Sequence, residues 1–189
     1  RDRATLTQHL VDEMERTFDL YQASLFLIDE HSRRLRLVAA SGERGASWVM
    51  GGWNISVGGS SLPGQVAQSG KEQMMQLSKG EISRLPGSRF EVSLPLMMRG
   101  DLLGVLDLHR TVAPFMPEET EVFRIVADYA AAALDNLRVL AETDAQLQEM
   151  RALYTQYTAA SWATLMEIEQ VDTYAIAEGE YVDELARVL

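Results

Sequence analysis

The feature that most constrains the fold of this chain is the absence of Gly and Pro between Pro117 and Gly179. Pro117 suits the first position of a helix, and three glutamates stand in the turn that follows, where negative charge favours the helix dipole. We therefore expect a helix from Pro117 to about residue 168, which would be about 78 Å long at about 1.5 Å per residue. Such a helix is far longer than its own domain needs.

Apolar residues recur along this helix at seven-residue spacing, which is typical of a coiled coil. An isolated apolar stripe would stay in water, so we expect a homodimer paired in parallel through this helix. An antiparallel pair and a solvated single helix are the alternatives. The apolar positions expected to form the dimer helix are Leu137, Leu140, Leu147, Tyr154 and Leu165. In the same frame the other core positions are polar and weaken the pairing: Asp144, Arg151, Thr158 and Ser161.

Charge and cysteine content exclude several classes of protein. The chain has 28 acidic and 17 basic residues, a formal net charge of -11 and no cysteine. The first 116 residues hold 13 of each sign, so the whole excess lies in residues 117–189. An acidic balance argues against nucleic-acid binding, which needs clustered Lys and Arg. Without cysteine there is no disulfide framework, thiolate zinc site, iron–sulfur cluster, cysteine nucleophile or thioether-linked bilin.

Location is predicted from what the sequence lacks. No apolar run approaches the roughly 18 residues of a membrane span, and no signal-peptide pattern precedes the first helix. The chain begins with Arg1 rather than Met. We therefore expect a cytoplasmic piece of a longer protein, without a membrane partner.

The part before Pro117 has the pattern of a mixed α and β domain. Six glycines within residues 42–61 predict loops and tight turns around one strand near residues 53–57. The other elements expected there are a helix over 4–20, two strands within 21–39, a short helix over 62–69 and a brief strand over 74–77.

Residues 90–109 give the clearest β signal, a hairpin with the three-residue loop Arg99-Gly100-Asp101. With Met98 opposite Leu102, one face of the hairpin is polar and the other apolar. The polar face carries Glu91, Ser93, Asp107 and His109. A shift of register by one residue would reverse the two faces.

Several segments together resemble a GAF domain: VSLPL at 92–96, Gly100, LGVLDL at 103–108, FMPEE at 115–119 and VADYAAAALDN at 126–136. The resemblance covers roughly residues 4–140. It implies an α+β fold with a central antiparallel sheet and the terminal helices on one face. On the other face it implies a pocket for a small ligand, roofed by residues 41–90. Such domains are common in bacterial signalling proteins, upstream of kinase, cyclase, phosphodiesterase or transcriptional output modules.

We expect three parts: a GAF sensor domain at 1–140, a coiled-coil signalling helix at 141–170, and a tail or the start of a following module at 171–189. The expected function is a small-ligand sensor and dimerisation module of a bacterial signalling protein. The ligand state would pass through the coiled coil to an output domain, for example the histidine kinase of a two-component system. The alternative is a structural dimerisation domain with no ligand.

The expected pocket joins the polar hairpin face to apolar residues of the loops and neighbouring strands. In cyclic-nucleotide-binding GAF domains the position matching Asp107 tends to face the ligand. The alternatives are a solvated sheet face for the polar residues and ordinary core for the apolar ones. The candidate pocket residues are Trp53, Met75, Phe90, Glu91, Ser93, Asp107 and His109.

The cofactor expectations are mostly negative, and the ligand itself is unknown. The family's cyclic-nucleotide motif is matched only by His109-Arg110, Phe115 and Glu118-Glu119, without its Asn. His109 is the one histidine expected to point into the pocket, and a single His without carboxylate or Cys companions at ligand spacing predicts neither a metal nor haem.

No catalytic motif stands out. There is no Ser–His–Asp arrangement with a nucleophile elbow and no phosphate-binding loop. The family's free methionine sulfoxide reductase branch needs cysteines, which are absent. We expect no enzyme activity in this fragment, although the parent protein can carry a kinase or cyclase output.

Overall fold

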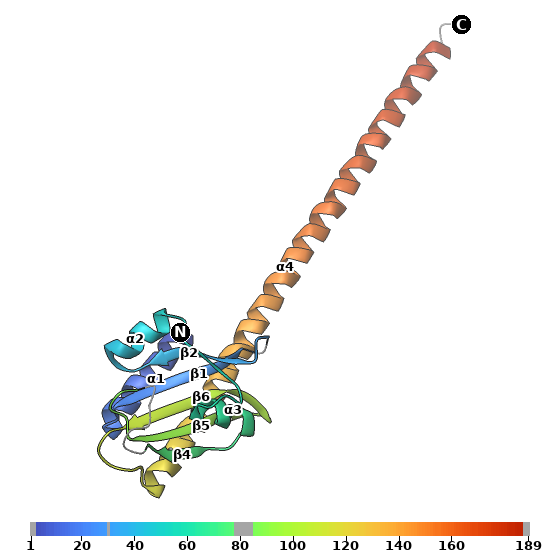
Figure 1. Cartoon of the computed structure of the whole chain (residues 1–189). Coiled ribbons are helices and arrows are strands. Elements are labelled where there is room, and N and C mark those ends of the chain that lie inside the picture. The colour runs from blue at the N-terminus through green and yellow to red at the C-terminus, as the bar shows by residue number, and fades with distance from the viewer. Residues whose placement is uncertain (1–2, 30, 78–84, 187–189) are drawn as a thin grey trace. The chain divides into compact units, whose positions relative to one another are not determined.

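Short helices are interspersed with strands along the first 116 residues, and one long helix follows (Figure 1). The computed structural model describes residues 3–29, 31–77 and 85–186, with side chains described through Ser161 except for Ala159. The elements are α1 (Arg3–Phe18), β1 (Gln22–Asp29), β2 (Arg34–Ala40), α2 (Gly42–Met50), β3 (Asn54–Ser56), α3 (Leu62–Ser69), β4 (Gln73–Gln76), β5 (Phe90–Met98), β6 (Asp101–Arg110) and α4 (Pro117–Ala186).

The strands form one six-stranded antiparallel sheet in the order β3-β2-β1-β6-β5-β4. The α1 helix and the first turns of α4 cover one face of this sheet, whereas α2 and α3 lie over the other (Figure 1). This α+β arrangement confirms the predicted fold class. The described chain divides into two compact units, residues 1–138 and 139–189, and the division falls within α4.

Helix α4 is 70 residues long and continues past the end expected near residue 168. Gly179 does not stop it, because one glycine inside a helix costs only about 1 kcal/mol relative to Ala and no Pro follows. The roles predicted for residues 141–170 and 171–189 stay predictions. Among the described helices, α4 included, none has an apolar stretch that would suit the interior of a bilayer.

The glycine-rich stretch differs from the prediction of loops around one strand, because it also contains the nine-residue helix α2. Its glycines stand where the backbone needs them. Gly42 begins the helix at a φ of +71°, and Gly51 and Gly52 end it. A Cβ on Gly45 would lie 2.6 Å from the backbone of Ala40, so this glycine lets α2 pack against the end of β2. The predicted strand is present as β3.

The hairpin of β5 and β6 has the predicted register at the polar residues and a different turn. The turn has two residues, Arg99 and Gly100, both with positive φ (+53° and +94°), as a type I′ turn requires. A bulge between Leu96 and Met97 in the pairing then shifts the register by one. The two departures cancel, so Glu91 still faces His109 and Ser93 faces Asp107.

An apolar core lies between the sheet and the terminal helices. Phe123 of α4 is fully buried there, and its ring meets those of Phe18 and Phe115 edge-on at centroid distances of 4.8 and 5.8 Å. Val92 and Leu108 reach this core from the sheet. A second cluster under α2 and α3 includes Phe26, Leu37, Ile55, Val66 and Val105.

Arg110, the last residue of β6, joins the sheet to both terminal helices. Its guanidinium donates to the carbonyl of Phe18 at 3.0 Å and to the two carboxylate oxygens of Glu119 at 2.9 and 3.1 Å. Glu119 also accepts from the backbone N–H of Met116 at 2.9 Å, so it caps the first turn of α4. The residue before this joint is His109, on the opposite face of the strand.

Candidate functional site

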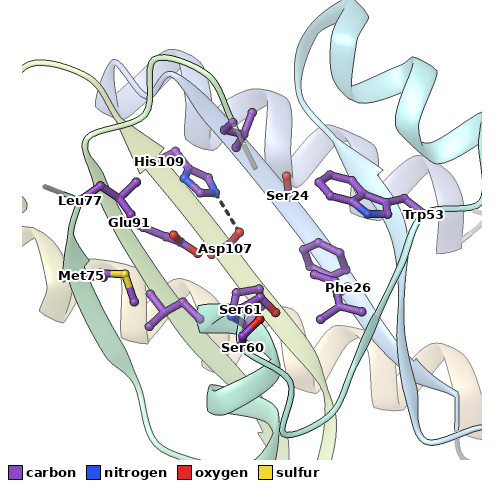
Figure 2. A pocket seen from close by; sticks show the side chains of 14 residues that line it. Ser24, Phe26, Trp53, Ser60, Ser61, Met75, Leu77, Glu91, Asp107 and His109 are labelled. Carbon is purple, nitrogen blue, oxygen red and sulfur yellow. Dashed lines mark hydrogen bonds and ion pairs between the residues drawn. The ribbon is translucent and has the colours of Figure 1, made fainter. Parts of the chain in front are cut away.

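A cavity of about 350 Å³ opens on the sheet face opposite the terminal helices. That volume lies within the usual range for sites that hold small molecules. Figure 2 shows Trp53 and Phe26 on one side, Met75 and Leu77 on the other, and three polar side chains between them. The lining residues are Ser24, Phe26, Trp53, Ile55, Ser60, Ser61, Leu62, Pro63, Met75, Leu77, Leu85, Glu91, Asp107 and His109.

Two rows of side chains cross the sheet at the cavity, and part of each row forms its floor. Antiparallel pairing aligns residues directly opposite one another, and alternation along each strand sends them to the same face. The first row is Gln22, His109, Glu91 and Met75. The second row is Ser24, Asp107, Ser93 and Gln73.

Asp107 and His109 form the centre of a buried hydrogen-bonded chain. Ser93 Oγ donates to Asp107 Oδ1 at 2.5 Å, and Asp107 Oδ2 lies 2.9 Å from His109 Nε2. On the far side of the ring, His109 Nδ1 lies 2.9 Å from Ser88 Oγ. Asp107 and His109 are only 5% and 4% exposed. These hydrogen bonds therefore hold the imidazole of His109 and the carboxylate of Asp107 in fixed orientations.

Two opposing effects act on the pKa of His109. Burial disfavours the charged imidazolium, but the Asp107 carboxylate, through its charge and its hydrogen bond, and the charge of Glu91 together outweigh burial. The pKa of His109 therefore lies above its ordinary value. The floor is an environment that favours positive charge.

Ser88, His109 and Asp107 are connected like a Ser–His–Asp triad, although no such arrangement was expected from the sequence. The nitrogens have the opposite roles from the hydrolase template, since Ser88 contacts Nδ1 and Asp107 contacts Nε2. Ser88 is 7% exposed and is absent from the cavity lining. Its position suits it to orient the ring rather than to attack a substrate.

The structure brings most of the predicted pocket residues together. Five of them line the cavity: Trp53, Met75, Glu91, Asp107 and His109. Ser93 is fully buried and reaches the cavity only through Asp107. Phe90 does not belong to the pocket, because alternation along β5 turns it to the other face and into the core against the terminal helices.

Sequence reasoning missed Ser24, Phe26 and the segment from Ser60 to Pro63. Ser24 and Phe26 belong to β1, which neighbours β6 but is far from it in sequence. Ser61 precedes the first residue of α3, yet its side chain makes no capping bond. Its Oγ is buried and has no hydrogen-bond partner among the described residues. The residue Ser61 lines the cavity.

Two carboxylates stand beside His109, which corrects the expectation that it has no companion at ligand spacing. One potential ligand atom each from Glu91, Asp107 and His109 lies within 4.8 Å of the others. Asp107 comes from two positions earlier on the same strand, and Glu91 is directly opposite on β5. The predicted register had placed these residues on one face, but their distances follow only from the folded sheet.

Comparison with solved structures finds the same fold in several proteins. The GAF domain from a phosphoenolpyruvate-protein phosphotransferase of Coxiella burnetii is similar with a TM-score of 0.66 at 19% identity, over 75% of this chain and 87% of that one. The second GAF domain of DevS from Mycobacterium smegmatis has a TM-score of 0.63 at 21% identity, over 75% and 99%. A free methionine-R-sulfoxide reductase from Neisseria meningitidis, in complex with its substrate, has a TM-score of 0.62 at 19% identity, over 74% and 81%.

Sequence comparison agrees with the fold. No curated protein matches the chain. The sequence model of the GAF domain family, in contrast, matches residues 3–136, which include the whole sheet and the cavity floor. GAF domains are generally sensor modules rather than catalysts, although the fold also occurs in the reductase named above. The chain therefore belongs to the GAF domain family, a common fold of signalling sensors.

Proposed function

We propose that this chain is the small-ligand sensor module of a bacterial signalling protein, and that its ligand presents a positively charged or hydrogen-donating group to the floor of the cavity. One observation carries the proposal. The floor holds the carboxylates of Glu91 and Asp107, and none of the described lining residues is Lys or Arg. A cationic or hydrogen-donating group of a ligand would meet these two carboxylates at the floor of the cavity.

The remaining walls support a compact ligand with an apolar part. Trp53 and Phe26 offer flat apolar surface on one side of the cavity. The Neisseria structure shows that a protein of this fold holds a small substrate. We do not propose reductase activity, because the chain has no cysteine, and its cytoplasmic location stays a prediction.

Arg110 provides a route from the cavity to the helices. It follows His109 directly in β6, and its guanidinium holds the end of α1 and the first turn of α4. A ligand that moves β6 at His109 would therefore act on the joint at Arg110. Signalling requires that the ligand bind two arrangements of this joint with different affinities.

The second part of the proposal is that α4 pairs in parallel with α4 of a second copy and transmits the signal to an output domain, for example a histidine kinase. Within residues 139–158 several large apolar side chains are exposed, among them Leu140, Leu147 and Tyr154. Met150 and Tyr157 are exposed too and lie three residues after Leu147 and Tyr154. They suit the pairing seam better than Arg151 and Thr158, the polar core positions of the predicted heptad frame.

Two other apolar positions were predicted for the seam, Leu137 and Leu165. Leu137 is only half-buried, so part of its side chain can still reach a partner. The side chain of Leu165 lies outside the described residues. The seam that we propose consists of Leu140, Leu147, Met150, Tyr154 and Tyr157, with Leu137 at its N-terminal end, and Leu165 stays a predicted position.

Native mass spectrometry of the purified chain tests the sensor proposal. We expect a bound molecule of defined mass, or a rise in melting temperature with a panel of small amines, and loss of either effect in Glu91→Gln. The matched control is Glu72→Gln, which removes a carboxylate outside the cavity. If neither effect is seen with the wild-type chain, the sensor proposal is wrong and the ligandless dimerisation domain takes its place.

A further inference from the structure

We infer that Glu91, Asp107 and His109 together bind a divalent transition-metal ion in the floor of the cavity. The inference deepens the proposed function and rests on the cavity being a binding site, since it names the cation that the floor takes. The protein would coordinate the ion through one imidazole nitrogen and two carboxylate groups. Its remaining coordination positions would face the open cavity, where water or a small molecule can occupy them.

The spacing of the ligand atoms suits one ion. Two ligands at right angles, each about 2.1 Å from a metal, lie about 3 Å apart. Asp107 Oδ2 and His109 Nε2 are 2.9 Å apart and so already have this spacing. Glu91 is half-buried on the neighbouring strand, with a carboxylate oxygen within 4.8 Å of both, and a side-chain rotation brings it to the ion.

The groups behind the ligands have the arrangement of an outer coordination shell. Metal-binding histidines usually donate their second ring N–H to a fixed acceptor, and metal-binding carboxylates are themselves hydrogen-bonded. Ser88 Oγ stands at His109 Nδ1, and Ser93 Oγ donates to Asp107 Oδ1. When the ion takes Nε2, any hydrogen there leaves to solvent, and the Nδ1 hydrogen points to Ser88.

The ligand types restrict the metal. One imidazole and two carboxylates suit borderline divalent ions such as Mn²⁺, Fe²⁺, Co²⁺ and Zn²⁺, whereas soft Cu(I) prefers thiolates and thioethers. Three protein ligands are the number found in metal sites that keep an open position. A purely structural Asp107–His109 pair does not explain the cavity that opens over Glu91, Asp107 and His109.

Titration of the chelator-treated chain with Co²⁺ tests the inference. We expect one ion per chain, visible ligand-field absorption, and displacement by Zn²⁺ measured by calorimetry. His109→Gln and Asp107→Asn should lose the absorption, and Glu91→Gln should weaken binding. Ser88→Ala should weaken binding about 10- to 100-fold although it removes no ligand. The matched control is His31→Gln, which removes an exposed histidine 4.0 Å from Asp29 and should change nothing.

The outcomes separate this inference from the proposed function. Glu91→Gln is nearly isosteric at a half-buried position, and an unchanged melting curve without metal shows that it folds. The metal site is refuted if the wild-type chain binds no Co²⁺, or if Glu91→Gln and His109→Gln bind it as well as the wild type does. If the chain binds an organic cation but no metal, the sensor proposal stands alone, and if it binds neither, both fail.

Discussion

Loss of the Glu119 carboxylate is expected to loosen the joint between the sheet and the terminal helices. Arg110 donates to both oxygens of Glu119, and only 13% of the Arg110 side chain and 30% of the Glu119 side chain are exposed. Glu119→Gln replaces this charged, two-point acceptor with a neutral amide. The guanidinium is then left partly buried with one charged acceptor fewer.

The size of the effect follows from how far the pair is buried. Exposed ion pairs contribute at most about 1 kcal/mol to the free energy of unfolding, whereas breaking a buried pair costs about 3–5 kcal/mol. Glu119 is partly exposed, so solvent screens the pair and its contribution lies between these two cases, nearer to that of an exposed pair. We expect a coupling free energy between Arg110 and Glu119 of about 1–2 kcal/mol.

The coupling should depend on pH. The hydrogen bonds from Arg110 lower the pKa of Glu119 below its ordinary value of 4.5; burial opposes this shift, and the Met116 N–H and the charge of Arg110 add to it. A lowered pKa in the folded state means that the stabilisation is present above pH 4.5 and is lost as the pH falls through the folded pKa. The difference between the wild type and Glu119→Gln should therefore disappear in acid.

Urea unfolding of a double-mutant cycle measures this coupling. The cycle comprises the wild type, Arg110→Met, Glu119→Gln and the double variant. Each is unfolded at neutral pH and at a series of lower pH values. Met keeps an apolar stem at position 110 but removes the guanidinium, whose carbon lies 4.7 Å from the centre of the Phe115 ring. The matched control is Glu13→Gln in the exposed pair with Arg16, which should not change stability measurably. A coupling below about 0.5 kcal/mol, or one that persists in acid, would refute the reasoning.

Three further predictions concern the core, the sheet and the long helix. Phe123→Ala should lower the free energy of unfolding by about 3–5 kcal/mol in urea titrations, whereas Tyr129→Ala, at a position 72% exposed, should change it little. Gly104→Ala should prevent folding or cost more than about 3 kcal/mol, beyond ordinary overpacking, because its Cβ would lie 2.0 Å from the carbonyl oxygen of Phe26. The control is Gly51→Ala, whose Cβ would lie no closer than 3.4 Å to another atom, and circular dichroism should show that this variant folds as the wild type does. The double variant Leu147→Glu/Tyr154→Glu should be a monomer in sedimentation experiments in which the wild type is a dimer. The control variant Ala145→Glu/Ala152→Glu, with both charges outside the proposed seam, should remain a dimer. If Leu147→Glu/Tyr154→Glu is still a dimer, the proposed seam is wrong.

Local physics made much of the fold predictable. Pro117 and the glutamates after it define the start of α4 without reference to any other segment. Alternation along Phe90–Met98 and Asp101–Arg110 was enough to divide the hairpin into a polar and an apolar face. The same alternation should have assigned Phe90 to the core, because it differs by one position from Glu91. That error came from the expected chemistry of an aromatic residue rather than from the pattern.

Other features depended on contacts between segments that lie far apart in the sequence. The glycines of the stretch 42–61 were predicted to break structure, but Gly45 permits the close approach of α2 to Ala40. The two-residue turn at Arg99 and the bulge between Leu96 and Met97 offset each other in the pairing of β5 with β6, and β6 pairs with β1 along its other edge. The spacing of residues along the hairpin sequence does not reveal a bulge of this kind.

The candidate site divides in the same way. The side-chain period of a strand was enough to predict that Glu91 shares a face with Ser93, and Asp107 with His109. That the two pairs lie on one face depended on the register of the hairpin, which the structure confirms. Only the tertiary structure decided that Ser88 orients the imidazole, that Ser24 extends the row, and that two carboxylates lie within reach of one nitrogen. Distances between side chains on different strands depend on how the whole sheet pairs and packs. Periodicity along the sequence determines only the face of the sheet to which each side chain points.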